Sequence, residues 1–494
     1  MLLDARNPDV TLEGSVDLAI VGAGPAGLVL ARELADIVSV TLIESGGIFP
    51  NSRVDALQHG ESIGLDYPLT ETRARGFGGS SSRWAGYCAL FDRHDFIERP
   101  WVDNSGWPFG VEALEPYYPR VAKFLNLGEA TFDAPSIAEK AGIPLPIDNH
   151  HVIPTVWRFG TPIQRFGKSL LKEFYSSTAI TALTHATVVD ILLDPERHTV
   201  TELVLRTLNG RTGSIRPKIV VLACGGLETP RLLLNANSQI SEGLGNGSDL
   251  VGRYFMEHPH FNIAPFELLQ PDIFTHWADR GRVKGGLEYL SCLGLSAEVQ
   301  EALGVLNARL HLYRTPSMAE TMETPRAGLF MEQAPNPASR VTLSQHRDTL
   351  GMRRLRLNWQ LNELDRQSFV KTARVISAEF EKKHYARLAY ALQDYPRFSL
   401  IPLHSNHQLG TTRMAKSSSH GVVDPNCRVH DISNLYIASG SVFPTVSWAN
   451  PTFTLMALSY RLAEQLRAKF QPSHIPSKSK TDIISKHHHQ QAGE

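Results

Sequence analysis

Residues 16–27, Val-Asp-Leu-Ala-Ile-Val-Gly-Ala-Gly-Pro-Ala-Gly, decide the fold of this chain. The first six are mostly apolar and β-prone, which is typical of a buried parallel strand. They run directly into glycines at G-x-G-x-x-G spacing, and a helical pattern follows over Leu28–Leu34. A second apolar run, Val38–Ile43, ends at Glu44. Strand, glycine turn, helix, strand and acid within ~30 residues predict a dinucleotide-binding unit.

Each glycine of this turn has a physical reason. Gly22 permits the tight turn, Gly24 lets the backbone approach a pyrophosphate, and Gly27 allows the helix to pack closely on the strand. Glu44 suits a ribose 2′-hydroxyl and disfavours a 2′-phosphate, so FAD or NAD is preferred over NADP. An ordinary glycine-rich turn is the alternative, but it would not require the strand, the helix and the acid together.

Length and composition exclude several classes of protein. The chain has 494 residues, which favours two or three domains or one large discontinuous domain. Apolar residues make up 42% and charged residues 20%, so the chain is globular rather than disordered. Its 49 basic and 50 acidic residues give a net charge of −1, which argues against binding nucleic acid.

The four cysteines stand far apart and form no C-x-x-C pair. A disulfide framework or a zinc ribbon is therefore not expected, and a reducing compartment, the cytoplasm, is predicted. We see neither a secretory signal nor a run of eighteen apolar residues, so no membrane span is predicted.

Further elements follow from periodicity. Strand-like runs cover 188–193, 200–205 and 219–223, and helical patterns cover Asp365–Glu381 and Thr452 to about Phe470. From Pro472 the chain is polar and is predicted to be disordered. His487, His488 and His489 lie in that tail, so no metal site is predicted.

Three glycine-punctuated segments carry chemistry-bearing residues: Arg75–Gly86, His404–Met414 and Leu435–Thr452. The first could equally be a linker, and a lone histidine in a loop is more often a surface or packing residue than a catalyst. Asn450 followed by Pro451 also has a purely structural interpretation, with Asn as the N-cap and Pro as the first residue of a helix.

Together with Ala223–Arg231 and Val251–Pro259, these motifs occur in an order that closely resembles the glucose–methanol–choline (GMC) oxidoreductases, flavoproteins that oxidise alcohols. The resemblance implies an α/β fold with a Rossmann-like FAD-binding domain built from discontinuous segments and a substrate-binding domain on an antiparallel sheet. We assign residues 1–100, 183–261 and 404–470 to the first domain. Residues 101–182 and 262–403 form the second, and 471–494 the disordered tail.

The resemblance also implies the cofactor contacts. The glycine turn would hold the FAD pyrophosphate, Glu44 the adenosine ribose, and Val188 the adenine through its backbone. A helix opening at Pro451 would point its positive end where negative charge develops on the flavin. The full set of expected FAD-binding residues is Gly22, Gly24, Gly27, Glu44, Gly79, Ser80, Trp84, Val188, Gly440, Pro451 and Thr452.

The family places a catalytic histidine three residues before a Gly-Thr pair, which here is His407. A second polar residue lies six residues after a proline, which from Pro444 is Asn450. A neutral imidazole near pH 7 suits the hydroxyl proton of an alcohol whose hydride passes to flavin N5. Asn450 can hydrogen-bond the same oxygen, so the sequence resembles the His–Asn subgroup of the family.

Two positions depart from the family pattern. Several sugar-oxidising relatives carry a histidine that binds the flavin covalently where this chain has Arg83, so non-covalent FAD is predicted. Ser439 stands where an aspartate is frequent in the family, so a changed hydrogen bond on the flavin side is expected.

The predicted function is FAD-dependent oxidation of a hydroxyl group on a sugar, aminosugar, cyclitol or related polyol to a carbonyl. The alternatives are another alcohol (steroid or aryl alcohol), a non-redox lyase, or a flavin-binding partner subunit without turnover. The electron acceptor would be oxygen, a quinone or a separate redox protein, because the chain has no C-x-x-C-H haem motif.

Overall fold

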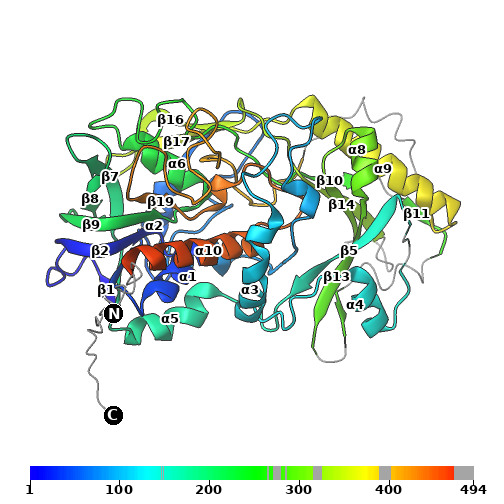
Figure 1. The fold of residues 1–494 in the computed structure, drawn as a ribbon, viewed down its shortest axis with the longest axis horizontal. Coiled ribbons are helices and arrows are strands. Elements are labelled where there is room, and N and C mark those ends of the chain that lie inside the picture. Colours follow the sequence, from blue (N-terminus) through cyan, green and yellow to red (C-terminus); the bar gives the residue numbers. More distant parts are fainter. Residues whose placement is uncertain are drawn as a thin grey trace, which may run out of the picture.

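The computed structural model describes residues 1–145, 147, 149–263, 266–270, 280–283, 286–314, 325–388 and 402–471. The predicted disordered tail lies outside these residues, apart from residue 471. Figure 1 shows two main sheets, one toward each end of the molecule, with helices packed around them.

The first sheet has eight strands in the order β1-β6-β3-β2-β9-β8-β7, and β19 also pairs with β9. Six of the strands run parallel to one another: β1, β6, β3, β2, β9 and β19. The other two, β8 and β7, extend the sheet beyond β9 in an antiparallel arrangement. The strands are β1 (Leu2–Asp4), β2 (Glu13–Val21), β3 (Val40–Ile43), β6 (Ile180–Thr184), β7 (Thr187–Leu193), β8 (Val200–Arg206), β9 (Thr212–Leu222) and β19 (Leu435–Ile437).

Apolar residues place the predicted nucleotide-binding unit in the main core. The last four residues of β2 and all of β3 are buried, as expected of strands covered on both faces. α1 (Pro25–Leu34) packs against the long α10 (Thr452–Phe470), so segments more than 400 residues apart lie side by side (Figure 1). The predicted strand–turn–helix–strand order is confirmed. The helix predicted from Thr452 to about Phe470 is also confirmed, as α10.

The second sheet has six strands, all antiparallel, in the order β10-β15-β14-β13-β12, with β5 paired to β13. α9 (Glu363–Lys382) contributes Phe369, Ala373 and Ile376 to a core shared with this sheet. The strands are β5 (Val152–Phe159), β10 (His260–Ile263), β12 (Gly281–Arg282), β13 (Glu288–Leu295), β14 (Ala308–Arg314) and β15 (Pro325–Met331). The mixed α/β class with a separate antiparallel sheet is confirmed.

Smaller elements complete the described part of the chain. The remaining strands form a three-stranded sheet, β16-β17-β4, and a two-stranded sheet, β11-β18. They are β4 (Gly60–Ser62), β11 (Phe266–Leu268), β16 (Arg340–Arg347), β17 (Arg353–Asn358) and β18 (Ala386–Leu388). The other α-helices are α2 (Ser52–Asp55), α3 (Tyr118–Phe124), α4 (Ala134–Ala141), α5 (Phe166–Ser176), α6 (Gly225–Asn235) and α8 (Ala297–Leu303).

We propose that the domain division follows the two main sheets. The boundary expected between residues 182 and 183 falls within β6, which belongs to the first sheet. The second sheet combines β5 with strands from residues 260–331. Both sheets are therefore built from discontinuous segments of the chain.

Candidate active site

A cavity of about 590 Å³ is lined by residues from both main sheets and from the loops around them. Its volume is in the range usual for ligand and cofactor sites. It is lined by every residue expected at the site except Gly27: Gly22, Gly24, Glu44, Gly79, Ser80, Trp84, Val188, His407, Gly440, Asn450, Pro451 and Thr452.

The glycine turn forms one wall of the cavity. Gly22 has φ +106°, and a Cβ there would lie 2.5 Å from the carbonyl oxygen of Ala223. Gly24 precedes α1 and no side chain caps the helix, so its first N–H groups are available to an anion. Gly27 lies behind the wall, because a Cβ there would run into the Gly22 carbonyl oxygen. The turn therefore offers a backbone cradle that side chains would fill.

Glu44 sits at the end of β3 beside this turn. Its Oε2 accepts from the Ala23 N–H at 2.9 Å and its Oε1 from the Gly46 N–H at 2.8 Å. The residue is 7% exposed. A carboxylate held by two backbone donors and lining the cavity fits a ligand hydroxyl such as a ribose 2′-OH.

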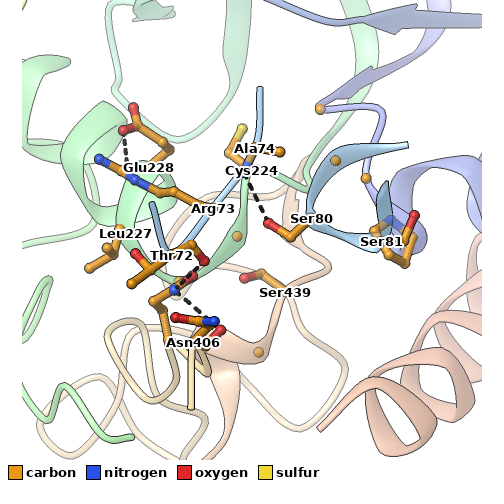
Figure 2. Close-up of a pocket in the computed structure, with 18 of the residues that line it drawn as sticks. Thr72, Arg73, Ala74, Ser80, Ser81, Cys224, Leu227, Glu228, Asn406 and Ser439 are labelled. Atoms are coloured by element: carbon orange, nitrogen blue, oxygen red, sulfur yellow. Dashed lines mark hydrogen bonds and ion pairs between the residues drawn. The ribbon is translucent and has the colours of Figure 1, made fainter. Parts of the chain in front are cut away.

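The Gly-Gly-Ser loop packs directly on the glycine turn. Gly79 has φ +53°, and a Cβ there would lie 2.9 Å from Gly24 Cα. The hydroxyl of Ser80 accepts from the Ala74 N–H at 3.3 Å (Figure 2). Trp84 donates its indole N–H to the Gln164 carbonyl at 2.8 Å. These contacts argue against a free linker and make the loop part of the cavity wall.

Two residues that depart from the family pattern also line the cavity. The Arg83 guanidinium donates to the Arg73 and Glu71 carbonyl oxygens at 3.3 and 3.4 Å. Ser439 accepts from the Ser441 N–H at 3.1 Å, so its hydroxyl stabilises a short turn. Both side chains therefore have structural partners of their own.

A buried ion cluster borders the same cavity and was missed by the sequence analysis. Glu228, in the first turn of α6, contacts Arg73 and Arg75 at 2.5 Å each and Arg231 at 3.1 Å (Figure 2 shows the Arg73 pair). Burial alone would raise the pKa of Glu228, but the three arginines hold it well below its usual range. Glu228 lies in the quoted Ala223–Arg231 motif, so its position was visible, but partners 153 and 155 residues upstream were not.

His407 and Asn450 meet at the other end of the cavity. The two side chains come from loops 43 residues apart, and Asn450 Nδ2 lies 3.3 Å from His407 Nε2. Burial, followed by the neighbouring His258, holds the pKa of His407 well below its usual value. The imidazole is therefore neutral at pH 7, as a proton acceptor must be. His404 points elsewhere, with its Nδ1 2.9 Å from Asn406 Oδ1 and its ring against Tyr67.

The predicted N-cap role of Asn450 is wrong. α10 begins at Thr452 with Pro451 at the cap position, and no side chain caps the helix. The Asn450 side chain turns instead toward the cavity, where Oδ1 accepts from the Trp157 indole N–H at 2.8 Å. The Asn-Pro pattern in the sequence favours a cap, but hydrogen bonds with Trp157 and His407, which are distant in sequence, orient the Asn450 side chain.

Two neighbours of His407 were also missed. His258 is fully buried, with Nδ1 2.9 Å from His407 Nδ1 and Nε2 3.0 Å from the carbonyl oxygens of Val446 and Ser447. The adjacent Glu257 carboxyl accepts from the backbone N–H groups of His258, Ser405 and His407 and from the Tyr67 hydroxyl. Burial raises the pKa of Glu257 to about 8, whereas all four donors favour the carboxylate. The quoted Val251–Pro259 motif contains both residues, but spacing alone assigned them no role.

The wall formed by the second sheet is aromatic and carries two imidazoles. Trp157, Phe330, His260 and His311 all line the cavity. Trp157 meets His311 edge-on at 5.5 Å, and Phe330 lies 6.0 Å from His407 between ring centroids. Within the described residues, no group of three or more His, Cys, Asp and Glu side chains is arranged to hold a metal ion.

Comparison with known proteins points to one family. Residues 335–459, which include His407 and Asn450, match the family model described as GMC oxidoreductase. A 2-methyl-1,2-propanediol dehydrogenase of Mycolicibacterium austroafricanum is 24% identical over 93% of this chain and 96% of its own. The fructose dehydrogenase large subunit of Gluconobacter japonicus is 28% identical, but the match covers only 50% of this chain and 47% of that one.

Solved structures of the same fold include a formate oxidase, with a TM-score of 0.64 and 19% identity over 94% of this chain and all of that one. A pyridoxine 4-oxidase from Mesorbium loti has a TM-score of 0.59 and 18% identity over 92% of this chain and 99% of its own. The family match, the full-length relative and the shared fold agree with the glycine turn and its cavity. Residues 335–459 therefore form a GMC oxidoreductase C-terminal domain, and the relatives and structural neighbours of the whole chain are FAD-dependent oxidoreductases that act on alcohol groups.

Proposed function

We propose that this enzyme oxidises a hydroxyl group of a sugar or related polyol to a carbonyl, with His407 as the general base and Asn450 as its hydrogen-bonding partner. The observation that carries the proposal is the meeting of these two side chains, 3.3 Å apart, in the cavity that the glycine turn also lines. When the substrate binds, its hydroxyl replaces the Asn450 amide at Nε2. The neutral imidazole then takes the hydroxyl proton there, and the Asn450 amide N–H donates to the hydroxyl oxygen.

We propose that the adenosine diphosphate half of FAD binds at the glycine turn, Glu44 and the Gly-Gly-Ser loop. The backbone cradle of the turn suits the pyrophosphate, and the Glu44 carboxylate suits the ribose. Val188, Trp84 and Gly440 line the rest of the path to Pro451 and Thr452. When bound, the flavin supplies the hydride acceptor.

We propose that the flavin is held non-covalently, because the arginine at position 83, unlike a histidine, is no nucleophile in proteins. Acid precipitation should leave the colour in the supernatant; a yellow pellet would contradict this.

The imidazole pair favours a polyol as substrate. His260 and His311 stack at 5.1 Å and 26° across Gly328, where a Cβ would run into His260 Nε2. His260 Nε2 and His311 Nδ1 are buried without a hydrogen-bond partner in the described part of the chain. Burial lowers the pKa of His260, and that of His311 to about 3, so both rings are neutral.

A neutral imidazole both donates and accepts a hydrogen bond, and unmet polar groups inside a protein are costly. Two such rings beside Trp157 and Phe330 combine an aromatic surface with hydrogen-bonding groups. That combination suits a sugar ring, which has an apolar face and several hydroxyls. A steroid would leave the imidazoles unmatched, so the polyol is preferred over the steroid or aryl-alcohol alternative.

Relatives named fructose dehydrogenase and C-glycoside 3-oxidase support a sugar, whereas those named 2-methyl-1,2-propanediol dehydrogenase and choline oxidase support smaller alcohols. We propose oxygen, a quinone or a separate redox protein as the electron acceptor. All four cysteines are unpaired, which supports a cytoplasmic location. None of the helices in the described part of the chain is long and apolar enough to cross a membrane.

The test is anaerobic bleaching of the purified holoenzyme by a panel of ketoses, aldoses, glycosides, cyclitols, small diols and aryl alcohols. We expect sugars or cyclitols to bleach the flavin fastest at equal concentration. Faster bleaching by small diols or aryl alcohols would overturn the substrate class. No bleaching by any alcohol of the panel would favour the partner-subunit alternative.

A further inference from the structure

We infer that His258 is a positioning residue that fixes His407 in a single tautomer, with the proton on Nδ1 and the lone pair on Nε2 facing Asn450. The inference deepens the proposed function and rests on it, because only a base needs its lone pair at a defined nitrogen. Two independent chains of hydrogen bonds, one entering from each end of the His407 ring, require the same tautomer.

The first chain starts at the backbone. His258 Nε2 lies 3.0 Å from the carbonyl oxygens of both Val446 and Ser447. Carbonyl oxygens only accept, so Nε2 of His258 carries the proton. Burial lowers the pKa of His258 to about 4, so the ring is neutral and its Nδ1 bears a lone pair. The 2.9 Å contact between the two Nδ1 atoms therefore needs its proton on His407.

The second chain starts at Trp157. An indole N–H can only donate, so the Asn450 atom 2.8 Å from it is the amide oxygen. The amide NH₂ then faces His407 Nε2 at 3.3 Å. Since this NH₂ only donates, Nε2 must accept and is unprotonated. Both ends of the ring thus agree.

The surroundings hold His258 rigidly in this role. Its ring stacks on Phe330 at 5.1 Å and 15°, and its backbone N–H donates to Glu257 Oε2 at 2.8 Å. The same glutamate accepts from the backbone N–H of His407, so one carboxyl orients both histidine backbones.

The tautomer determines where the proton goes. When the substrate O–H bond breaks, its proton forms an N–H bond at Nε2 of His407. A bound flavin would supply the acceptor for the hydride of the carbinol carbon. The imidazolium keeps its Nδ1–H on His258. Among the described residues, the Nε2 atom of His258 contacts two backbone carbonyl oxygens and no further proton carrier, so the proton leaves through the cavity rather than through the protein behind it.

The direct test is the ¹⁵N chemical shifts of the His407 ring in the histidine-labelled holoenzyme, assigned by difference with His407→Gln. Protonated and unprotonated ring nitrogens differ clearly in this measurement. We expect Nδ1 to be of the protonated type and Nε2 of the unprotonated type at pH 7.5. The reverse assignment, or fast exchange between the two forms, overturns the inference.

Two variants link the tautomer to the rate. His258→Phe keeps a ring on Phe330 but removes both nitrogens, so we expect mixed tautomers and flavin reduction slowed by roughly 10²-fold, with FAD still bound. His258→Asn keeps an acceptor near Nδ1 and should restore the tautomer and most of the rate. His404→Asn is the matched control and should change neither. A wild-type tautomer and rate in His258→Phe overturns the inference, and if that variant fails to fold, the wild-type spectrum decides.

Failure of the proposed function looks different. If His407→Ala reduces its flavin at the wild-type rate, His407 is not the base, whatever the nitrogen shifts show. If His407→Ala abolishes reduction but Nε2 of His407 is protonated in the wild type, His407 remains the base, and the inference that His258 fixes its tautomer is wrong.

Discussion

The two ends of the cavity are built on different principles. At the glycine-turn end, recognition comes mainly from the backbone: Gly22 and Gly79 bring main-chain atoms so close together that a side chain at either position would clash. At the other end, His407, Asn450 and His258 form a network of side chains drawn from three distant loops. The centre of the first end, the glycine turn with Glu44, is specified by one stretch of sequence, residues 16–44, whereas the second exists only once the two sheets have come together.

The difference bears on what mutation should do. A substitution in the backbone cradle removes the cofactor altogether because the cradle has no room to adjust. A substitution in the side-chain network should leave the cofactor in place and change the rate, the affinity for substrate or the pH profile.

The largest effect is expected from Gly22→Ala. The added Cβ would lie 2.5 Å from the Ala223 carbonyl at a φ of +106°, so the turn must shift. We expect the purified variant to contain almost no FAD by absorbance. Gly210→Ala is the matched control, since Gly210 also has a positive φ (+90°) but nothing within 4 Å of its Cβ position. Equal FAD loss in both variants would mean that backbone strain, not the cradle, is responsible.

Asn450→Ala should slow flavin reduction by about tenfold, less than loss of the base, because it removes one neutral hydrogen bond of about 1 kcal/mol. It should also cost roughly 1 kcal/mol of stability, since the Trp157 indole N–H loses its acceptor. Denaturant unfolding in the Trp157→Phe background checks the cause: there Asn450→Ala should cost less stability than in the wild type, because only the contact with His407 is left to lose. An equal cost in both backgrounds would mean that the Trp157 contact does not contribute.

His311→Phe should raise KM several-fold for a sugar substrate while leaving flavin reduction at saturating substrate unchanged. The variant keeps an aromatic ring beside Trp157 but removes both nitrogens. Steady-state and stopped-flow kinetics separate the two parameters. An unchanged KM would mean that the imidazole pair does not contact the substrate.

The smallest change is expected from pH. The active form of His407 is neutral, and its pKa is held well below the usual value. The rate of flavin reduction should therefore be flat from about pH 6.5 to 8 and fall only as the pH drops toward the lowered pKa. A rate that still rises between pH 7 and 8 would show that His407 is not buried as described or that another group is the base.

The same contrast explains what the sequence predicted. Gly22, Gly27 and Glu44 lie in one short segment whose spacing is dictated by backbone geometry, so the strand, turn, helix and second strand were predicted correctly; the role of Glu44 stays a prediction. Asn450 lies in a segment whose local signal, a residue before Pro451, favours a cap. Its actual partners, Trp157 and His407, are 293 and 43 residues away, so no local pattern reports them.

His258 and Glu228 show a second limit. Both lie in motifs that the sequence made recognisable, yet their partners are backbone carbonyls near residue 446 and arginines near residue 73. Such contacts depend on how the loops close over the first sheet, and periodicity and spacing carry no information about that closure.

The most direct test of the central claim compares anaerobic flavin reduction in His407→Ala and His404→Ala by stopped flow, with the best substrate of the panel. We expect His407→Ala to bind FAD normally and to slow reduction by ~10²–10⁴-fold, because it removes a positioned base. His404 contacts Asn406 and Tyr67 rather than Asn450, so His404→Ala should reduce at close to the wild-type rate. Normal reduction in His407→Ala together with loss of reduction in His404→Ala would contradict the account.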